Sequence, residues 1–178
     1  MNVRRAVFLD RDGVLNEPIL RNGRPYPPSG LHELNIVRDA EAVLARLKQC
    51  GFLLVVVTNQ PDVARGTSTE TDVERIHRHL ASHLPLDDFF TCYHDDSDHC
   101  DCRKPLPGLL VKAAAQYGID LAKSYMVGDR WRDIDAGFAA GCRTVLIDLH
   151  YNEHKSAAKP DCVVKSLTEA CDWICATA

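Results

Sequence analysis

Two aspartates, Asp10 and Asp12, follow an apolar run near the start of the chain, in the stretch FLDRDGVLNE (residues 8–17). One residue separates them, and two carboxylates about 4 Å apart repel by roughly 4 kcal/mol at an effective dielectric near 20. A purely structural role does not require that cost. The pair therefore indicates a bound cation or a reaction on a phosphate group.

Further polar residues of the types used in phosphoryl transfer occur along the chain. They are Thr58, Asn59 and Gln60, then Arg103 and Lys104, and finally Asp129, Arg130 and Asp133. A carboxylate can act as the nucleophile and form an aspartyl-phosphate. A divalent cation neutralises the acids and the phosphate oxygens, while a lysine and a hydroxyl hold the transferred group. The set predicts phosphoryl transfer to a carboxylate, provided that the fold brings these residues together.

Short runs rich in Val, Leu and Ile alternate with segments of helical pattern. The runs predict strands at 6–10, 52–59, 89–94, 125–129, 143–148 and 162–164. The other segments predict helices at 39–50, 69–83, 107–117, 131–140 and 167–176. This alternation is typical of an α/β fold with a doubly wound, mostly parallel sheet. Because ligands bind outside the carboxyl ends of such strands, the polar residues are expected to meet at one edge.

The chain of 178 residues shows no internal repeat and no linker, which predicts a single domain over 1–178. The segment 16–30 contains four prolines and two glycines and is expected to be a long loop, as lids and binding loops often are. The polar segment 148–161 is also expected to be a loop, with no predicted role.

The net charge of −4 argues against nucleic acid or an anionic membrane as a partner. The first residues lack the apolar region of a signal peptide, and no apolar run is long enough to cross a bilayer. We therefore expect a cytoplasmic protein that acts on a small molecule, with a monomer as the simplest assembly.

Cysteine and histidine residues gather in one short segment, as Cys92-x-His94 followed by Cys100-x-Cys102. Three thiolates and an imidazole suit tetrahedral Zn²⁺, and four protein ligands leave no open position, which predicts a structural site. His99 is an alternative ligand, but His94 is preferred because it continues the strand that holds Cys92. The zinc loop would position the residues that directly follow Cys102.

The acidic character of this segment and the positions of the other cysteines add two further expectations. Its stretch DDSDHCD is acidic, which argues against a zinc ribbon that binds nucleic acid. The other five cysteines lie in apolar contexts and are expected to be buried thiols. They are Cys50, Cys142, Cys162, Cys171 and Cys175.

Four motifs, in order along the chain, resemble those of the haloacid dehalogenase superfamily of phosphotransferases. They are FLDRDG (8–13), VVVTN (55–59), CRKP (102–105) and GDRWRD (128–133). The resemblance spans nearly the whole chain and implies the Rossmann-like fold of that superfamily. No insertion is long enough for a separate cap domain, which disfavours phosphomutase chemistry.

The resemblance also implies a role for each matching residue. Asp10 is the expected nucleophile, and Asp12 is the expected general acid–base that protonates the leaving alkoxide and then activates water. Mg²⁺ is expected to bind Asp10, Asp129 and the backbone carbonyl of Asp12, since it prefers oxygen ligands. Thr58 and Lys104 are expected to hold the phosphoryl group. Because all of these residues are present, a catalytically inactive module is disfavoured.

Asp133 and two arginines are assigned to the surroundings of the reacting group. Asp133 is expected to support Lys104 or a metal-bound water; the alternative is a solvent-facing acid in the first turn of a helix. Arg103 and Arg130 are expected at the rim, where they would bind a second phosphate, since arginine suits bidentate phosphate binding. The alternative for both is a solvated surface arginine.

Within the superfamily, the zinc loop, CRKPxPG and the DRDGVLN and TNQ stretches resemble the D,D-heptose 1,7-bisphosphate phosphatases. This implies hydrolysis of D-glycero-D-manno-heptose 1,7-bisphosphate to heptose 1-phosphate, with Asn59 and Gln60 near the substrate. Histidinol-phosphate phosphatases share the zinc loop and are the alternative, as is another small sugar-phosphate phosphatase. Pro61-Asp62 stands where the subgroup often has Ser-Gly, so the exact sugar and its anomer are left open.

Overall fold

The computed structural model describes residues 3–178, which form a central six-stranded sheet in which every pairing is parallel. The order of the strands is β5-β4-β1-β6-β7-β8. Their bounds are β1 (Arg5–Leu9), β4 (Phe52–Asn59), β5 (Asp88–Cys92), β6 (Tyr125–Gly128), β7 (Arg143–Ile147) and β8 (Cys162–Val164). The predicted α/β fold with a mostly parallel sheet is confirmed.

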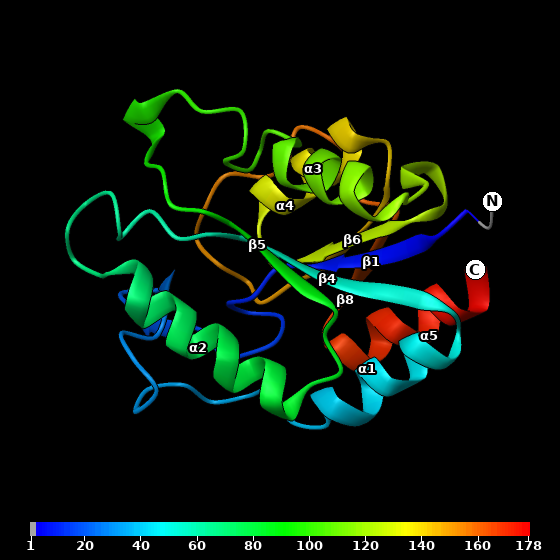
Figure 1. The fold of residues 1–178 in the computed structure, drawn as a ribbon, viewed down its shortest axis with the longest axis horizontal. Coiled ribbons are helices and arrows are strands. Elements are labelled where there is room, and N and C mark those ends of the chain that lie inside the picture. The colour runs from blue at the N-terminus through cyan, green and yellow to red at the C-terminus, as the bar shows by residue number, and fades with distance from the viewer. Residues whose placement is uncertain (1–2) are drawn as a thin grey trace.

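Helices cover both faces of this sheet (Figure 1). Their bounds are α1 (Ala40–Gln49), α2 (Glu70–His83), α3 (Gly108–Tyr117), α4 (Trp131–Ala140) and α5 (Leu167–Thr177). One face is covered by α1, α2 and α5, and the other by α3 and α4. Each face has its own apolar core, and β1 contributes to both because successive strand residues point to opposite sides. Val7 and Leu9 belong to the first core, and Ala6 and Phe8 to the second.

The segment 16–30, expected to be a plain loop, contains a two-stranded antiparallel hairpin. Its strands are β2 (Ile19–Arg21) and β3 (Arg24–Tyr26), joined by Asn22 and Gly23, whose φ angles are 53° and 73°. An Asn-Gly pair with two positive φ angles is the preferred connection of a tight hairpin. The hairpin was therefore readable from the sequence, although the surrounding prolines favoured a loop. Two 3-10 turns, Asp96–Asp98 and Leu121–Lys123, were not predicted either.

Two further expectations need correction. β5 ends at Cys92, so His94 lies beyond the strand that was predicted to include it. The expectation of five buried thiols is wrong for Cys50, Cys162 and Cys175, which are partly exposed because they lie at the ends of elements. The thiols of Cys50 and Cys175 lie 3.0 Å apart. Among residues 3–178, no helix has both the length and the apolar character that crossing a membrane requires.

Candidate active site and cysteine–histidine cluster

The carboxyl ends of the neighbouring strands β4, β1 and β6 meet at the edge where the predicted residues were expected. Thr58 lies near the end of β4, while Asp10 and Asp129 directly follow β1 and β6. The Asp10 N–H donates to the Val127 carbonyl at 3.0 Å, which joins two of these strand ends. A pocket opens at this edge, and its wall includes Asp10, Asp12, Lys104, Asp129 and Asp133.

The ammonium group of Lys104 is buried at the centre of the site. It donates to Asp10 Oδ1 at 2.8 Å, to Asp133 Oδ1 at 2.6 Å and to the Val57 carbonyl at 2.8 Å. Burial favours a lower pKa for Lys104, but the carboxylates of Asp10 and Asp133 outweigh burial and raise the pKa. The lysine is therefore charged at neutral pH.

Asp10, Asp129 and Asp133, here called the acid cluster, each place a carboxylate oxygen within 4.8 Å of the others. Burial raises the pKa of Asp10 to about 6; Lys104 opposes this shift, and the neighbouring acids add to it. Burial, followed by the charges of Asp10 and Asp133, raises the pKa of Asp129 well above its usual range. One lysine does not balance three carboxylates, and so the acid cluster holds an excess of negative charge.

The oxygens of the acid cluster are not equally engaged. Asp133 uses both, because Oδ1 accepts from Lys104 and Oδ2 accepts from the Arg130 N–H at 3.1 Å. Asp129 Oδ1 is buried and has no hydrogen-bond partner among the described residues. A buried, unpaired carboxylate oxygen beside excess negative charge fits a divalent cation with a preference for oxygen ligands, such as Mg²⁺.

Two glycines allow the acids to come this close. A Cβ atom on Gly13, whose φ is +90°, would lie 1.9 Å from Asp129 Oδ2. A Cβ atom on Gly128 would lie 2.1 Å from the Cβ of Asp133. Any side chain at either position would therefore displace a carboxylate of the acid cluster.

Asp12 is held by three neighbouring side chains. Arg11, which is itself fully buried, donates to the two carboxylate oxygens at 3.1 and 3.0 Å, and it also contacts His77 Nε2 at 3.3 Å. Asn16 and Gln60 donate to Asp12 at 3.0 and 2.9 Å. Burial favours a higher pKa for Asp12, but Arg11 and these hydrogen bonds outweigh it and lower the pKa. Asp12 is therefore ionised in the free protein.

The end of β4 brings three predicted residues to the site, Thr58, Asn59 and Gln60. Most of their side-chain hydrogen bonds are made with other residues of the site. Thr58 is buried, and its Oγ1 accepts a hydrogen bond from Gln60 Nε2 at 3.0 Å. The Asn59 amide makes two 3.0 Å hydrogen bonds with the backbone of Lys104, one as donor and one as acceptor. Asn59 also borders the pocket, while Gln60 is buried against Asp12.

Arg103 and Arg130 border the pocket as predicted, but each already has an acidic partner. Arg103 Nε donates to Asp96 at 2.7 Å, and Arg130 Nε donates to Glu153 at 2.9 Å. Arg132, which the sequence did not single out, also borders the pocket and donates to Asp96 at 3.2 Å. The wall therefore carries guanidinium groups that are oriented by acids.

Two acids on the loop between β5 and α3 accept hydrogen bonds from several arginines that border the pocket. Asp95 accepts from Arg65 at 2.7 Å on each of its two oxygens, and Asp96 accepts from Arg103 and Arg132. Arg65 and Arg132 belong to other segments of the chain, and Arg65 also borders the pocket. This loop therefore sets the positions of three guanidinium groups.

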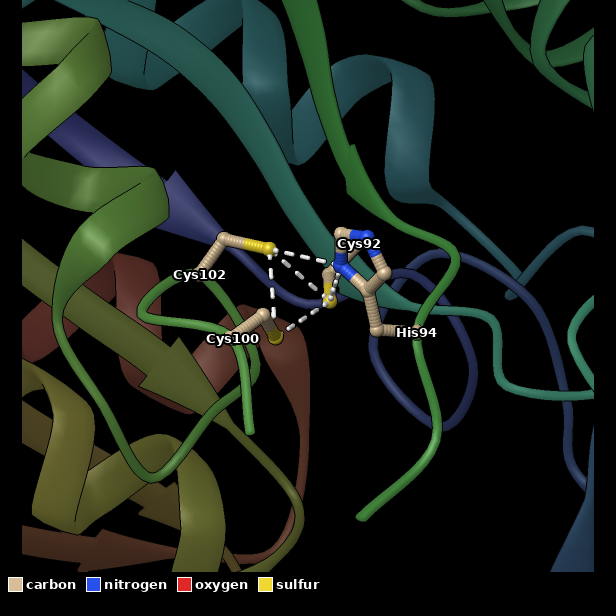
Figure 2. Close-up of side chains that lie close together, drawn as sticks. All are labelled: Cys92, His94, Cys100 and Cys102. Carbon is tan, nitrogen blue, oxygen red and sulfur yellow. Dashed lines mark hydrogen bonds between the residues drawn. The ribbon is translucent and has the colours of Figure 1, made fainter. Parts of the chain in front are cut away.

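The same loop brings together Cys92, His94, Cys100 and Cys102, here called the cysteine–histidine cluster (Figure 2). The Cys102 Sγ lies 3.1 Å from that of Cys92, 3.5 Å from that of Cys100 and 3.3 Å from His94 Nδ1. A tetrahedral zinc with Zn–S bonds of about 2.3 Å has S–S edges of roughly 3.8 Å. The Cys92–Cys100 pair at 3.7 Å and the Cys100–Cys102 pair at 3.5 Å come near this value, while the Cys92–Cys102 pair is shorter. His99, exposed and with a φ of 49°, is not part of the group.

Two residues of the segment 148–161 reach the site although the sequence gave this segment no role. The Tyr151 hydroxyl donates to Asp129 Oδ2 at 2.8 Å, and Glu153 pairs with Arg130. Burial and the charge of Asp129 raise the pKa of Tyr151, so the hydroxyl keeps its proton. No periodicity or motif marks these two residues. Arg11, by contrast, lies inside the first motif and could have been selected.

Comparisons with known proteins agree with this geometry. Residues 101–170 match the sequence model of the HAD-hydrolase-like family. The chain is 39% identical to the D-glycero-beta-D-manno-heptose-1,7-bisphosphate 7-phosphatase of Yersinia pestis, over 80% of this chain and 79% of that protein. It is 35% identical to the protein of the same name from Escherichia coli (strain K12), over 95% of this chain and 87% of that protein.

A solved structure supports the same relationship. The D,D-heptose 1,7-bisphosphate phosphatase from B. bronchiseptica, solved with magnesium and phosphate, superposes with a TM-score of 0.77. It is 29% identical, and the match covers 98% of this chain and 99% of that one. The chain therefore belongs to the haloacid dehalogenase-like phosphatases, in the family that contains the D-glycero-beta-D-manno-heptose-1,7-bisphosphate 7-phosphatases.

Proposed function

We propose that this protein is a Mg²⁺-dependent phosphatase that hydrolyses D-glycero-D-manno-heptose 1,7-bisphosphate to heptose 1-phosphate. The observation that carries the proposal is the buried contact of Lys104 with Asp10 and Asp133, beside the unpaired oxygen of Asp129. The curated relatives, named for this reaction, supply the substrate.

The residues of the site support a reaction in two steps. A carboxylate oxygen of Asp10 attacks the phosphorus and forms an aspartyl-phosphate. Asp12, which is ionised in the free protein, takes up a proton from the monoanionic phosphate of the incoming substrate and gives it to the leaving sugar oxygen. Asp12, now ionised, takes a proton from the water that attacks the aspartyl-phosphate, and inorganic phosphate leaves. Lys104 and Thr58 hold the transferred group, and Asp133 positions Lys104 through the 2.6 Å contact.

The cation would be held by Asp10, Asp129 and the backbone carbonyl of Asp12. When bound, Mg²⁺ neutralises the acids and the phosphate oxygens, which lowers the repulsion between the nucleophile and the phosphate. Asp133 is excluded from direct binding in this proposal, because both of its oxygens are already engaged.

We also propose that the cysteine–histidine cluster binds a structural Zn²⁺. Three thiols and one imidazole nitrogen lie close enough together to ligate one tetrahedral zinc, and four protein ligands leave no open position. Because thiolates bind zinc only in the reduced form, this assignment agrees with a cytoplasmic location. The six-stranded sheet, which runs through most of the chain, supports one catalytic domain over 1–178.

The second phosphate of the substrate would be bound by Arg103 and Arg130, which border the pocket beside Lys104 and Asp129. Asp96 and Glu153 orient the two guanidinium groups and leave further N–H donors for an anion. A monophosphate lacks this second contact, so the arginines would decide between the two kinds of substrate.

The test compares phosphate release from heptose 1,7-bisphosphate (both anomers), fructose 1,6-bisphosphate and histidinol phosphate. We expect the highest kcat/KM with a heptose bisphosphate and no activity without Mg²⁺. A preference for histidinol phosphate over every bisphosphate would replace the proposed substrate. Full activity in metal-free buffer would remove the Mg²⁺ site.

Arg103→Ala tests the second phosphate contact. A hydrogen bond to a charged group contributes about 1.5–3 kcal/mol, so kcat/KM for the bisphosphate should fall roughly 10- to 150-fold. Hydrolysis of p-nitrophenyl phosphate, which has no second phosphate, should hardly change. Arg103→Lys keeps the charge without the planar fork and should lie between wild type and Arg103→Ala. An equal fall for both substrates would show that Arg103 serves hydrolysis or folding in general and does not bind the second phosphate.

A further inference from the structure

One short segment, 148–153, contacts two consecutive residues at the end of β6. Tyr151 donates its hydroxyl proton to Asp129 Oδ2 at 2.8 Å. Two residues further on, Glu153 accepts from Arg130 Nε at 2.9 Å. The segment also carries its own turn, in which the His150 N–H bonds the Asp148 carboxylate at 2.9 Å. These contacts fix the segment over the proposed cation site.

The carboxylate of Asp129 is constrained from two directions. Its Oδ2 lies so close to Gly13 that a Cβ there would be at 1.9 Å, and the same oxygen accepts the Tyr151 hydroxyl. Its Oδ1 is buried and has no partner among residues 3–178. One oxygen is therefore held by the protein, and the other is left over for a ligand.

We propose that Tyr151 is a positioning residue for the cation site: by holding Asp129 Oδ2, it presents Oδ1 to Mg²⁺. This inference rests on the proposed function, which needs that cation. Without the hydroxyl, the Asp129 side chain can rotate, and either oxygen can turn away from the cation. Partners that hold a metal ligand in this way typically contribute a factor of 10 to 100 in affinity.

The alternative is that the hydroxyl only closes the loop 148–161 over the strand ends. A second alternative is that it competes with the cation for Asp129. The three readings differ in the sign of the change in Mg²⁺ affinity when the hydroxyl is removed. Positioning predicts weaker binding, loop closure predicts no change, and competition predicts tighter binding.

The experiment measures Mg²⁺ binding by titration calorimetry, without chelators so that the cysteine–histidine cluster stays intact. Tyr151→Phe removes only the hydroxyl and should raise the Mg²⁺ dissociation constant by about 10- to 100-fold. Tyr117→Phe is the matched control, because Tyr117 donates to Asp88 at 2.6 Å at the opposite end of the sheet. This control should bind Mg²⁺ like wild type.

Two results would overturn the proposal. One is a dissociation constant for Tyr151→Phe within threefold of wild type or below it, and the other is an equal loss in Tyr117→Phe. In phosphate release, saturating Mg²⁺ should restore the kcat of Tyr151→Phe, as weakened binding requires. Wild type that binds Mg²⁺ but releases no phosphate from heptose bisphosphate would refute the proposed function and leave the binding comparison intact.

A measurement on the unaltered protein keeps the proposal testable if Tyr151→Phe is unstable. The chain has five tyrosines, which can be labelled with ¹³C at the ring carbon that carries the hydroxyl. Addition of Mg²⁺ should shift the Tyr151 resonance and leave that of Tyr117 unchanged. Unchanged resonances for all five would show that no tyrosine hydroxyl senses the cation.

Discussion

The acid cluster and the cysteine–histidine cluster both place ligand atoms within 4.8 Å of one another, yet they differ in almost every other respect. In the acid cluster, Asp10 and Asp129 directly follow strands and Asp133 lies in the first turn of α4. All three are buried, and Asp129 keeps one unpaired oxygen among the described residues. The cysteine–histidine cluster combines Cys92, the last residue of β5, with three residues of the following loop, and its ligand atoms contact each other. A catalytic metal site needs an open coordination position for the substrate, whereas a structural metal site is filled completely by protein ligands.

The largest expected effect is on turnover, through Asp10→Asn. The amide keeps the shape of the side chain but is no nucleophile, so kcat should fall on the order of 10³- to 10⁶-fold. The same change should stabilise the Mg²⁺-free protein at pH 7, because burial raises the pKa of Asp10 to about 6 and so disfavours its charge. Phosphate release and thermal melting in Mg²⁺-free buffer measure both effects.

A gain of about 1 kcal/mol corresponds to roughly 2–4 °C in a chain of this size. Turnover within tenfold of wild type would contradict the covalent mechanism. A lower melting temperature in Asp10→Asn would contradict the charge excess of the acid cluster.

The second effect is on stability, through Cys102→Ser in the other cluster. Loss of a metal ligand should cost about 3 kcal/mol or more and lower the melting temperature by at least about 6 °C. Zinc content should fall from about one per chain to well below it, as elemental analysis can show. Cys162→Ser, outside the cluster, is the control and should keep its zinc.

The choice of histidine can be tested in the same assay. His94 Nδ1 is 3.3 Å from the Cys102 thiol, so His94→Ala should lose zinc, while His99→Ala should retain it. If His99→Ala loses zinc and His94→Ala does not, the zinc ligand is His99 and not His94. A zinc-free wild type with unchanged melting would remove the metal from the cysteine–histidine cluster.

The smallest expected effect is a pH dependence confined to the acid cluster. The folded pKa of Asp10 lies above its unfolded value, so the folded state binds more protons between about pH 4 and 6. Without Mg²⁺, the contribution of Asp10 to the free energy of unfolding should therefore fall as pH rises through this window. Mg²⁺ relieves the repulsion and should raise the melting temperature more at pH 7.5 than at pH 5. Equal shifts at both pH values would count against this assignment.

The sequence was sufficient to predict those parts of the site that follow from strand ends or from short spacings along the chain. Asp10, Thr58 and Asp129 follow apolar runs, and parallel strands bring their carboxyl ends to one edge, so the meeting of these residues could be predicted. The cysteine–histidine cluster was equally readable, because its ligands lie within eleven residues and their types suit one metal. Short separations along the chain restrict the geometry strongly.

The sequence was insufficient wherever a loop crosses the site. Tyr151 and Glu153 reach residues 22 and 23 positions earlier, and loop paths leave no hydrophobic periodicity to read. The acidic partners of Arg103 and Arg130 were missed as well: Glu153 reaches Arg130 from a separate segment, and Asp96 reaches Arg103 through the path of an irregular loop, which no sequence pattern specifies. The hairpin turn at Asn22-Gly23 was available in the sequence and was outweighed by the nearby prolines.

The arginine contacts of Asp95 and Asp96 have a consequence for how this protein would respond to nutrient supply. Lys104 is anchored independently by Asn59, Asp10 and Asp133, whereas Arg65, Arg103 and Arg132 rely on the loop of the cysteine–histidine cluster. We expect loss of zinc to reduce the preference for one phosphate ester over another before it stops hydrolysis. Magnesium starvation should instead stop hydrolysis, while the arginines keep the positions that Asp95 and Asp96 give them. The two metals would therefore affect different properties of the protein.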